Sequence, residues 1–285
     1  MAGKFFILFF FLLSACTVFR KDPAKGNPPG TLQINDTLYI DQTEVGNIHW
    51  REYLFYLSGV EKNELRYKKA LPDTSVWPVI NRSDTGTFVS YSPNPLSEYY
   101  LRHPSFNSYP VVGVSYEQVI EFCKWRTYAA NQGMYFRENN IRDPENHLKD
   151  DFPIRFYYRL PTKEEWEQVA ANILDTAIFP YGYKNIHTKW RGRQVEMFNC
   201  IYPGKKINAG SKSDRTYTVE LHSYFPNAPG CYNMIGNLAE MVSTKGIAKG
   251  GSFLHSLDSC RISIDQHYDK PGMWLGFRCV AVKIK

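Results

Sequence analysis

The sequence predicts an α+β fold that is rich in loops. Gly236, Gly250, Gly251 and Gly276 mark positions where the backbone needs a positive φ or a close approach that a Cβ would block. Their concentration in one segment indicates irregular structure, not a helix bundle. Aromatic residues make up 15% of the chain, beside 17 Pro and 19 Gly. This composition suits a compact domain, since disordered chains lack aromatic residues.

Residues 1–16, MAGKFFILFFFLLSAC, have the features of a bacterial lipoprotein leader. Lys4 gives the leader a positively charged N-terminal region. The apolar run that follows is too short to span a bilayer. The last four residues, LSAC, fit a lipobox. We predict that residues 1–15 are a signal peptide and that Cys16 is lipidated. The alternative is an ordinary signal peptide with a chance cysteine.

The residues after Cys16 predict where the protein is attached. Thr17 stands where an inner-membrane retention signal would carry Asp, which indicates an outer-membrane lipoprotein, with the domain on the periplasmic side. Residues 16–36 are expected to form a lipidated tether, because Pro and Gly in 21–30 favour a flexible chain. Residues 37–285 are then expected to form the folded domain. The lipid anchor makes the membrane one expected binding partner of the protein.

One strand and three helices can be placed from hydrophobic patterns. Residues 37–43 predict a strand with Leu38 and Ile40 on one face. Residues 44–57, 115–129 and 162–172 predict helices, and the last two begin with the capping boxes Ser115–Gln118 and Thr162–Glu165. The side chains expected on the buried helix faces are Trp50, Tyr53, Leu54, Leu57, Val119, Ile120, Cys123, Arg126, Trp166, Val169, Ala170 and Ile173.

Two polar stretches are expected to be surface loops. They are residues 131–151, which look like an insertion, and the basic, turn-rich residues 185–217. The net charge of the chain is +6, but its basic residues are scattered between acidic ones. Nucleic-acid binding is therefore not expected.

Five short motifs stand out along the chain: YPVVGVSY (109–116), RLPTKEEWE (159–167), GCYNMIGNLAE (230–240), GGSF (250–253) and GFRC (276–279). They resemble the hallmarks of the formylglycine-generating enzyme (sulfatase-modifying factor) domain, occur in the family's order and cover roughly residues 38–282. The resemblance implies a single formylglycine-generating-enzyme-like fold of the C-type-lectin-like kind, with short antiparallel strands and two or more helices. Two further motifs, ALPDTSVW (70–77) and YYLRHP (99–104), resemble a narrower branch, the gliding-motility and type IX secretion lipoproteins of Bacteroidota.

Enzymes of this family use two cysteines after the Gly-Gly-Ser motif to hold copper(I), a soft ion that prefers thiolates. In this chain the two positions are His255 and Cys260, and Ala239 replaces a Trp that lines the pocket of active members. Ser252 matches the active-site serine. A wider, wetter pocket is expected around Ala239, and copper is not favoured. His255 and Cys260 could still bind a metal as a mixed pair, but a surface His and a semi-buried Cys fit as well.

Two further features concern the stability of the fold. Asn233, Gly236, Leu238 and Glu240 could gather oxygen ligands around calcium, and all four match family positions. Alternatively, Asn233 and Glu240 satisfy backbone groups of the loop. Among the cysteines that remain after Cys16, the resemblance implies a disulfide between Cys123 and Cys279, and Cys260 is the candidate unpaired thiol.

The sequence leaves the function open between three classes and leans against an enzyme. The first is a lipid-anchored scaffold that binds protein partners, which the resemblance places in gliding motility or type IX secretion. The alternative is a copper-dependent oxidase that makes formylglycine from cysteine in exported sulfatases. A third is a ligand-binding protein that uses a remnant pocket formed by Ser252, His255 and Cys260. Function resides in such sites and not in the fold.

Overall fold

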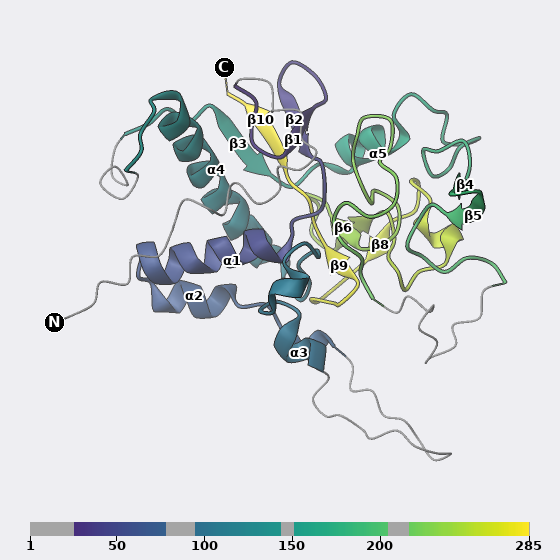
Figure 1. The fold of residues 1–285 in the computed structure, drawn as a ribbon, viewed down its shortest axis with the longest axis horizontal. Helices are drawn as coiled ribbons and strands as arrows, with labels where there is room; N and C mark the ends of the chain where they lie inside the picture. The colour runs from purple at the N-terminus through teal and green to yellow at the C-terminus, as the bar shows by residue number, and fades with distance from the viewer. Residues whose placement is uncertain (1–25, 78–94, 144–150, 205–216, 285) are drawn as a thin grey trace, which may run out of the picture.

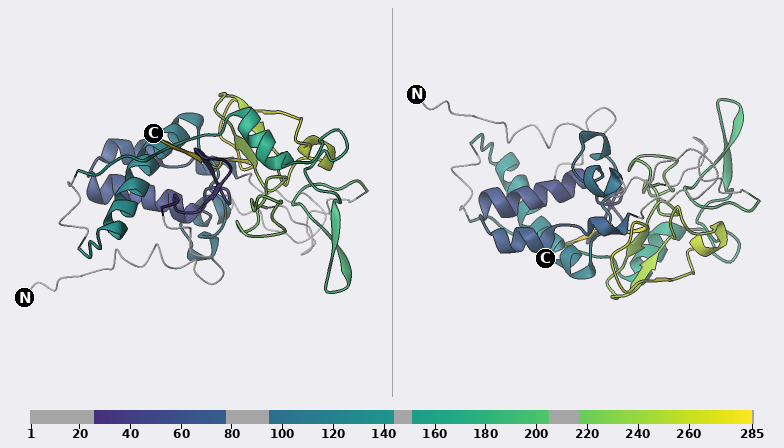
Figure 2. Two further views of the ribbon diagram at one scale, coloured as in Figure 1. Left: turned by 90° about the horizontal axis from the view of Figure 1, so that it is seen from above. Right: turned by 90° about the horizontal axis from the view of Figure 1, so that it is seen from below.

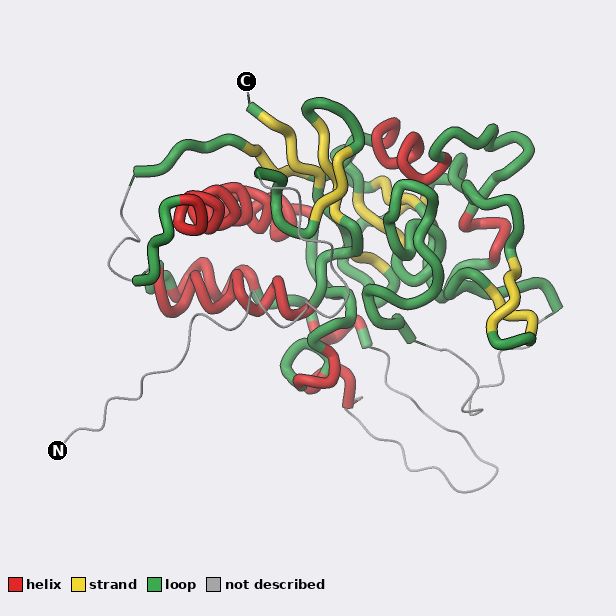
Figure 3. The backbone as a smooth tube through the Cα atoms, turned by 45° about the horizontal axis from the view of Figure 1, so that its top comes forward, coloured by secondary structure: helices red, strands yellow, loops and turns green. Residues whose placement is uncertain are grey.

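The computed structural model describes residues 26–77, 95–143, 151–204 and 217–284. The predicted signal peptide and residues 16–25 of the predicted tether, with Cys16, lie outside them. The helices α1, α2 and α4 lie together at one end of the molecule, and α5 and most of the short strands lie at the other (Figure 1). Loops connect most of this second half (Figure 3), as the glycine-rich segment predicts. Within the described residues, no helix is both long and apolar enough to cross a bilayer.

A four-stranded antiparallel sheet joins the two halves. Its order is β1 (Thr31–Gln33), β2 (Leu38–Asp41), β10 (Val280–Lys283) and β3 (Phe156–Arg159). The strand near the C-terminus thus lies beside a strand near the N-terminus, with Val280 opposite Ile40. Both faces of the inner strand β2 are buried, because Tyr39 packs into a core with α1 and α4 while Ile40 packs into a second core with α5.

The predicted helices form, with different ends. Helix α1 (Asn47–Phe55) begins three residues later than expected, after the N-cap Gly46, and continues into a π-helical turn (Tyr56–Val60). Helix α5 (Lys163–Ala171) has the predicted capping box, but Ile173 is 90% exposed and does not belong to its buried face. The helix ends before it, where Asn172 adopts a positive φ of 55°.

Helix α4 (Tyr116–Glu138) has the predicted capping box but extends far beyond residue 129. The expectation of an inserted loop from residue 131 is therefore wrong for 131–138. Asn131 is buried, and its side chain bonds the backbone of Arg155 and Phe156. These bonds attach the extended part of α4 to the free edge of β3.

The remaining elements are short. A second sheet has the order β8 (Gln266–His267), β7 (Ile247–Lys249), β6 (Ala239–Met241) and β9 (Leu275–Gly276), and the β6–β9 pair is parallel, against the expectation of antiparallel strands. Within 185–217, β4 (His187–Trp190) and β5 (Arg193–Glu196) form a hairpin that projects from the body (Figure 2). The other helices are α2 (Glu64–Ala70), α3 (Pro95–Tyr99) and the 3-10 turns Thr74–Val76, Pro104–Phe106 and Leu257–Cys260.

Candidate functional site

The segment from Gly250 to Cys260 holds the residues at the family's copper positions. Gly250 and Gly251 have φ values of 85° and 66°, as their sequence context predicts. A Cβ on Gly251 would lie 2.4 Å from the sulfur of Cys260. Cys260 is fully buried in the second core, not semi-buried as expected. The thiol is thus packed behind the Gly-Gly turn.

His255 is fixed by its neighbours in the same segment. Its Nδ1 lies 2.7 Å from the Ser252 hydroxyl, which also accepts the backbone N–H of Leu254 at 3.2 Å. The ring meets that of Trp274 edge-on, with 5.2 Å between centroids. Burial holds the pKa of His255 below its usual value, which favours the neutral imidazole.

The two copper positions do not form the two-thiolate site that copper(I) prefers. One holds an imidazole whose Nδ1 is engaged by Ser252, and the other holds the buried Cys260 thiol. In the described part of the chain, no group of three or more His, Cys, Asp or Glu side chains is arranged to hold a metal ion. We derive no chemical step through copper from these residues.

The expectation of a wide, wet pocket at Ala239 is wrong. Its side chain is fully buried in the first core, and its backbone N–H donates to the carbonyl of Trp274 at 2.9 Å. The neighbouring strands β7 and β9 close around it. An indole from another part of the chain, Trp274, reaches His255 instead.

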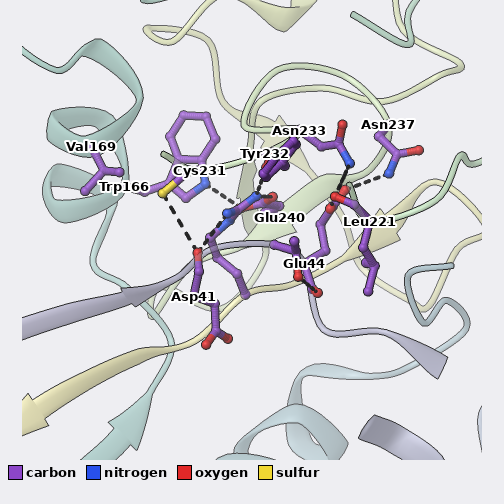
Figure 4. Close-up of polar contacts among 12 residues, drawn as sticks. Asp41, Glu44, Trp166, Val169, Leu221, Cys231, Tyr232, Asn233, Asn237 and Glu240 are labelled. Atoms are coloured by element: carbon purple, nitrogen blue, oxygen red, sulfur yellow. Dashed lines mark hydrogen bonds and ion pairs between the residues drawn. The ribbon is translucent and has the colours of Figure 1, made fainter. Parts of the chain in front are cut away.

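Two of the candidate calcium residues, Asn233 and Glu240, are buried, and their side chains bond other protein groups (Figure 4). The Glu240 carboxylate accepts two bonds from Arg278, each 2.6 Å, and one from Trp166 Nε1 at 2.7 Å. Gly236 donates its N–H to the Gly250 carbonyl, and Leu238 is buried in a third core. Calcium binding stays a prediction. A cation at Glu240 would compete with the buried guanidinium of Arg278.

Asn233 is directed to a carboxylate that sequence reasoning missed. Its Nδ2 donates to Glu44 at 3.2 Å, and Asn237 Nδ2 donates to the other Glu44 oxygen at 2.7 Å. Glu44 is buried, and burial raises its pKa to about 7, with Arg278 lowering it and Glu240 raising it. The sequence placed Glu44 at the start of a helix.

Comparisons with known proteins show the family of the chain. The family model for the sulfatase-modifying factor enzyme 1-like domain matches residues 12–283. This chain belongs to that family. The predicted resemblance is therefore confirmed at the level of the family, and the narrower link to gliding-motility lipoproteins is not shown by it.

Three curated relatives illustrate the range of the family. The formylglycine-generating enzyme of Bos taurus is 23% identical over 297 residues, which cover 90% of this chain and 68% of that protein. That of Thermomonospora curvata is 27% identical over 158 residues, 43% of this chain. The chaperone protein LppX of Paenibacillus barcinonensis is 26% identical over 191 residues, 58% of this chain. The chain spans 49% of the Thermomonospora enzyme and 66% of LppX.

Solved structures of similar proteins include PvdO from Pseudomonas aeruginosa, with a TM-score of 0.46 and 15% identity over 87% of this chain and 80% of that one. Another is CarF, with a TM-score of 0.46 and 16% identity over 90% of this chain and 96% of that one.

The raised pKa of Glu44 predicts a pH-dependent stability. A carboxyl whose pKa is higher in the folded than in the unfolded chain stabilises the fold fully below the unfolded pKa, and this contribution is lost as the pH rises through the folded pKa. We expect the free energy of unfolding to fall between about pH 4.5 and 7 for this reason. Glu44→Gln, which mimics the protonated form, should flatten this decline in urea titrations at several pH values.

Glu52 offers a matched comparison, because burial raises its pKa to about 7 as well. Glu52→Gln should remove a separate part of the decline, so the two single variants should be additive. An unchanged pH profile in Glu44→Gln would show that this carboxyl is ionised in the folded protein.

The predicted disulfide partners lie side by side in this family member. The sulfurs of Cys123 and Cys279 are 3.7 Å apart, and both residues are buried free thiols in the structure. The hydrogen bond to Cys279 and burial raise the pKa of Cys123. Asp41 lies next to them, with its carboxylate bonded to Arg126 and to the N–H of Cys279. The disulfide itself stays a prediction.

If this disulfide forms in the exported protein, a reductant should lower its free energy of unfolding by about 2–4 kcal/mol, because the bond restricts the unfolded chain. Cys123→Ser should be less stable than the oxidised protein and insensitive to reductant. Chemical denaturation with and without dithiothreitol measures both. A reductant effect that persists in Cys123→Ser would assign the bond to other cysteines.

Proposed function

We propose that this chain is a lipid-anchored, non-catalytic member of its family that binds partner proteins at the periplasmic face of the outer membrane. The observation that carries the proposal is the state of the two copper positions. His255 is bonded to Ser252, and Cys260 is packed behind Gly251. Oxidation at copper(I) needs a preorganised pair of soft ligands, which this segment lacks.

The chaperone relative supports a role in which the family's fold acts on other proteins without the oxidase reaction. The motifs in residues 70–77 and 99–104 suggest, within this proposal, an assembly role in gliding motility or type IX secretion. In the same proposal Cys16 holds the domain at the membrane, and calcium, if bound at Asn233 and Glu240, is structural.

The second candidate is a copper-dependent oxidase that forms formylglycine in exported sulfatases. It is favoured by the relatives named formylglycine-generating enzyme and by the serine and cysteine retained at positions 252 and 260. Oxidase activity would require the buried thiol of Cys260 to become accessible to copper and to the substrate.

Membrane extraction tests the proposed binding function. The tagged full-length chain, expressed in its native host, should fractionate with membranes and retain partners after mild detergent extraction. Cys16→Ser should move to the soluble fraction and lose those partners. A wild-type chain recovered as a monomer without partners would contradict the proposal.

A further inference from the structure

The β4–β5 hairpin is an exposed basic element that the site does not use. It projects from the body at the end opposite α1, α2 and α4 (Figure 2). Residues 189–194 are all exposed, and Trp190 is 56% exposed. The exposed stretch reads KWRGRQ, with three cations and no acidic residue.

The turn of the hairpin holds an arginine in a strained backbone conformation. Trp190 pairs with Arg193, so Arg191 and Gly192 form a two-residue turn with φ values of 49° and 78°. Such a turn favours Asn, Asp or Gly at its first position, and most other residues are strained there. An arginine at this position costs stability, which indicates that its charge has a use at the tip.

The cations of the hairpin have no acidic partner among the described residues. The side chains of Lys189, Arg191 and Arg193 have no hydrogen bond or ion pair with other described residues. Trp190 and Arg193 are directly opposite in the register, so their side chains share one face of the hairpin. The face therefore offers an indole beside an unpaired guanidinium, the two side-chain types that most often dominate protein interfaces.

The position of the indole distinguishes a protein partner from a membrane. A hairpin that inserts into a bilayer would lead with apolar residues, but the leading residues are Arg191 and Gly192. Trp190 lies behind them against Phe225 of the body, with 6.2 Å between ring centroids. Phe225 is in turn held by a bond from the Tyr183 hydroxyl to its carbonyl, 3.1 Å. The exposed part of the Trp190 indole therefore lies on the side of the hairpin and not at its tip.

We propose that this hairpin is a docking element for an acidic segment of a partner protein. Carboxylates of the partner pair with Arg191 and Arg193, and an apolar side chain of the partner packs on Trp190. The proposal deepens the proposed function, since it names the surface by which the chain binds a protein.

The test uses the purified, folded chain and a short fluorescent peptide of alternating Glu and Leu, with a Gln and Leu peptide as its uncharged counterpart. The wild type should bind the acidic peptide, more weakly as salt increases. The variant K189Q/R191Q/R193Q should bind it about tenfold more weakly. The matched control is K62Q/K68Q/K69Q, which removes the same charge from exposed positions near and within α2 and should bind like the wild type.

A single substitution at the turn separates binding from folding. Arg191→Asn should raise the Tm by about 1–3 °C, because Asn tolerates the positive φ, while it weakens peptide binding. Equal losses in the two triple variants would overturn the proposal, as would the absence of peptide binding. Hairpin-dependent binding to phosphatidylglycerol vesicles that exceeds peptide binding would assign the hairpin to the membrane instead. Peptide binding and membrane co-purification are separate measurements, so failure of one is distinguishable from failure of the other.

Discussion

Glu240→Gln should lower the free energy of unfolding by about 3–5 kcal/mol, because it leaves the Arg278 guanidinium buried without its counter-charge. Both side chains of this ion pair are fully buried. Arg278 also donates to the carbonyls of Asp41 and Tyr232, at 3.0 and 2.7 Å. Through Arg278 the pair connects β2 and Tyr232 to β6 of the second sheet. Urea denaturation followed by circular dichroism measures the loss.

An exposed ion pair provides the control for this substitution. Glu64 and Lys68 on α2 lie 2.7 Å apart with side chains 78% and 65% exposed. Glu64→Gln should change the stability by less than about 1 kcal/mol. The double variant E240M/R278M should recover much of the loss, because apolar side chains can replace a buried pair. A Glu240→Gln loss no larger than that of Glu64→Gln would show that water or an ion reaches Arg278.

Gly251→Ala should destabilise the protein by about 2–5 kcal/mol, the sum of two costs. The positive φ of Gly251 costs an alanine about 1–2 kcal/mol. The added Cβ would also lie 2.4 Å from the Cys260 sulfur, and crowding of this kind costs about 1–3 kcal/mol. Thermal and chemical denaturation of the single variant give the total.

Two variants separate these costs. Gly192→Ala, at a φ of 78° with no atom within 4 Å of the new Cβ, should show the backbone cost alone. Adding Cys260→Ala to Gly251→Ala should relieve part of the crowding, so the two substitutions should be non-additive. Additive effects, with Gly251→Ala no worse than Gly192→Ala, would show that the Cys260 thiol is not packed behind the Gly-Gly turn.

Local signals in the sequence predicted local structure well. The capping boxes at Ser115 and Thr162 begin their helices because each pairs a hydroxyl and a side chain three residues later with backbone N–H groups. Gly276 was predicted to need a close approach or a positive φ, and a Cβ there would lie 2.6 Å from Leu238. The capping boxes depend on neighbours that are near in sequence, whereas the glycine signal at Gly276 holds whichever distant side chain comes close.

The features that sequence reasoning missed depend on distant contacts. Glu44 meets Asn233 and Asn237 only because β2 brings the two ends of the chain together. Asn131 is polar and looked like part of a loop, but β3 supplies the partners that let it lie buried in α4. At Ala239, the size of the side chain predicted a hollow, whereas the surrounding strands and core fill the space.

The most direct test of the account is the reaction itself. The purified chain, loaded with copper(I) and supplied with dioxygen, is incubated with a C-x-P-x-R peptide, and formylglycine is measured by mass spectrometry. His255→Cys, which restores a second thiol at the copper positions, is the matched variant and should bind copper(I) more tightly than the wild type. We expect no formylglycine from the wild-type chain. Conversion of the peptide by the wild type would contradict the claim that this family member is non-catalytic.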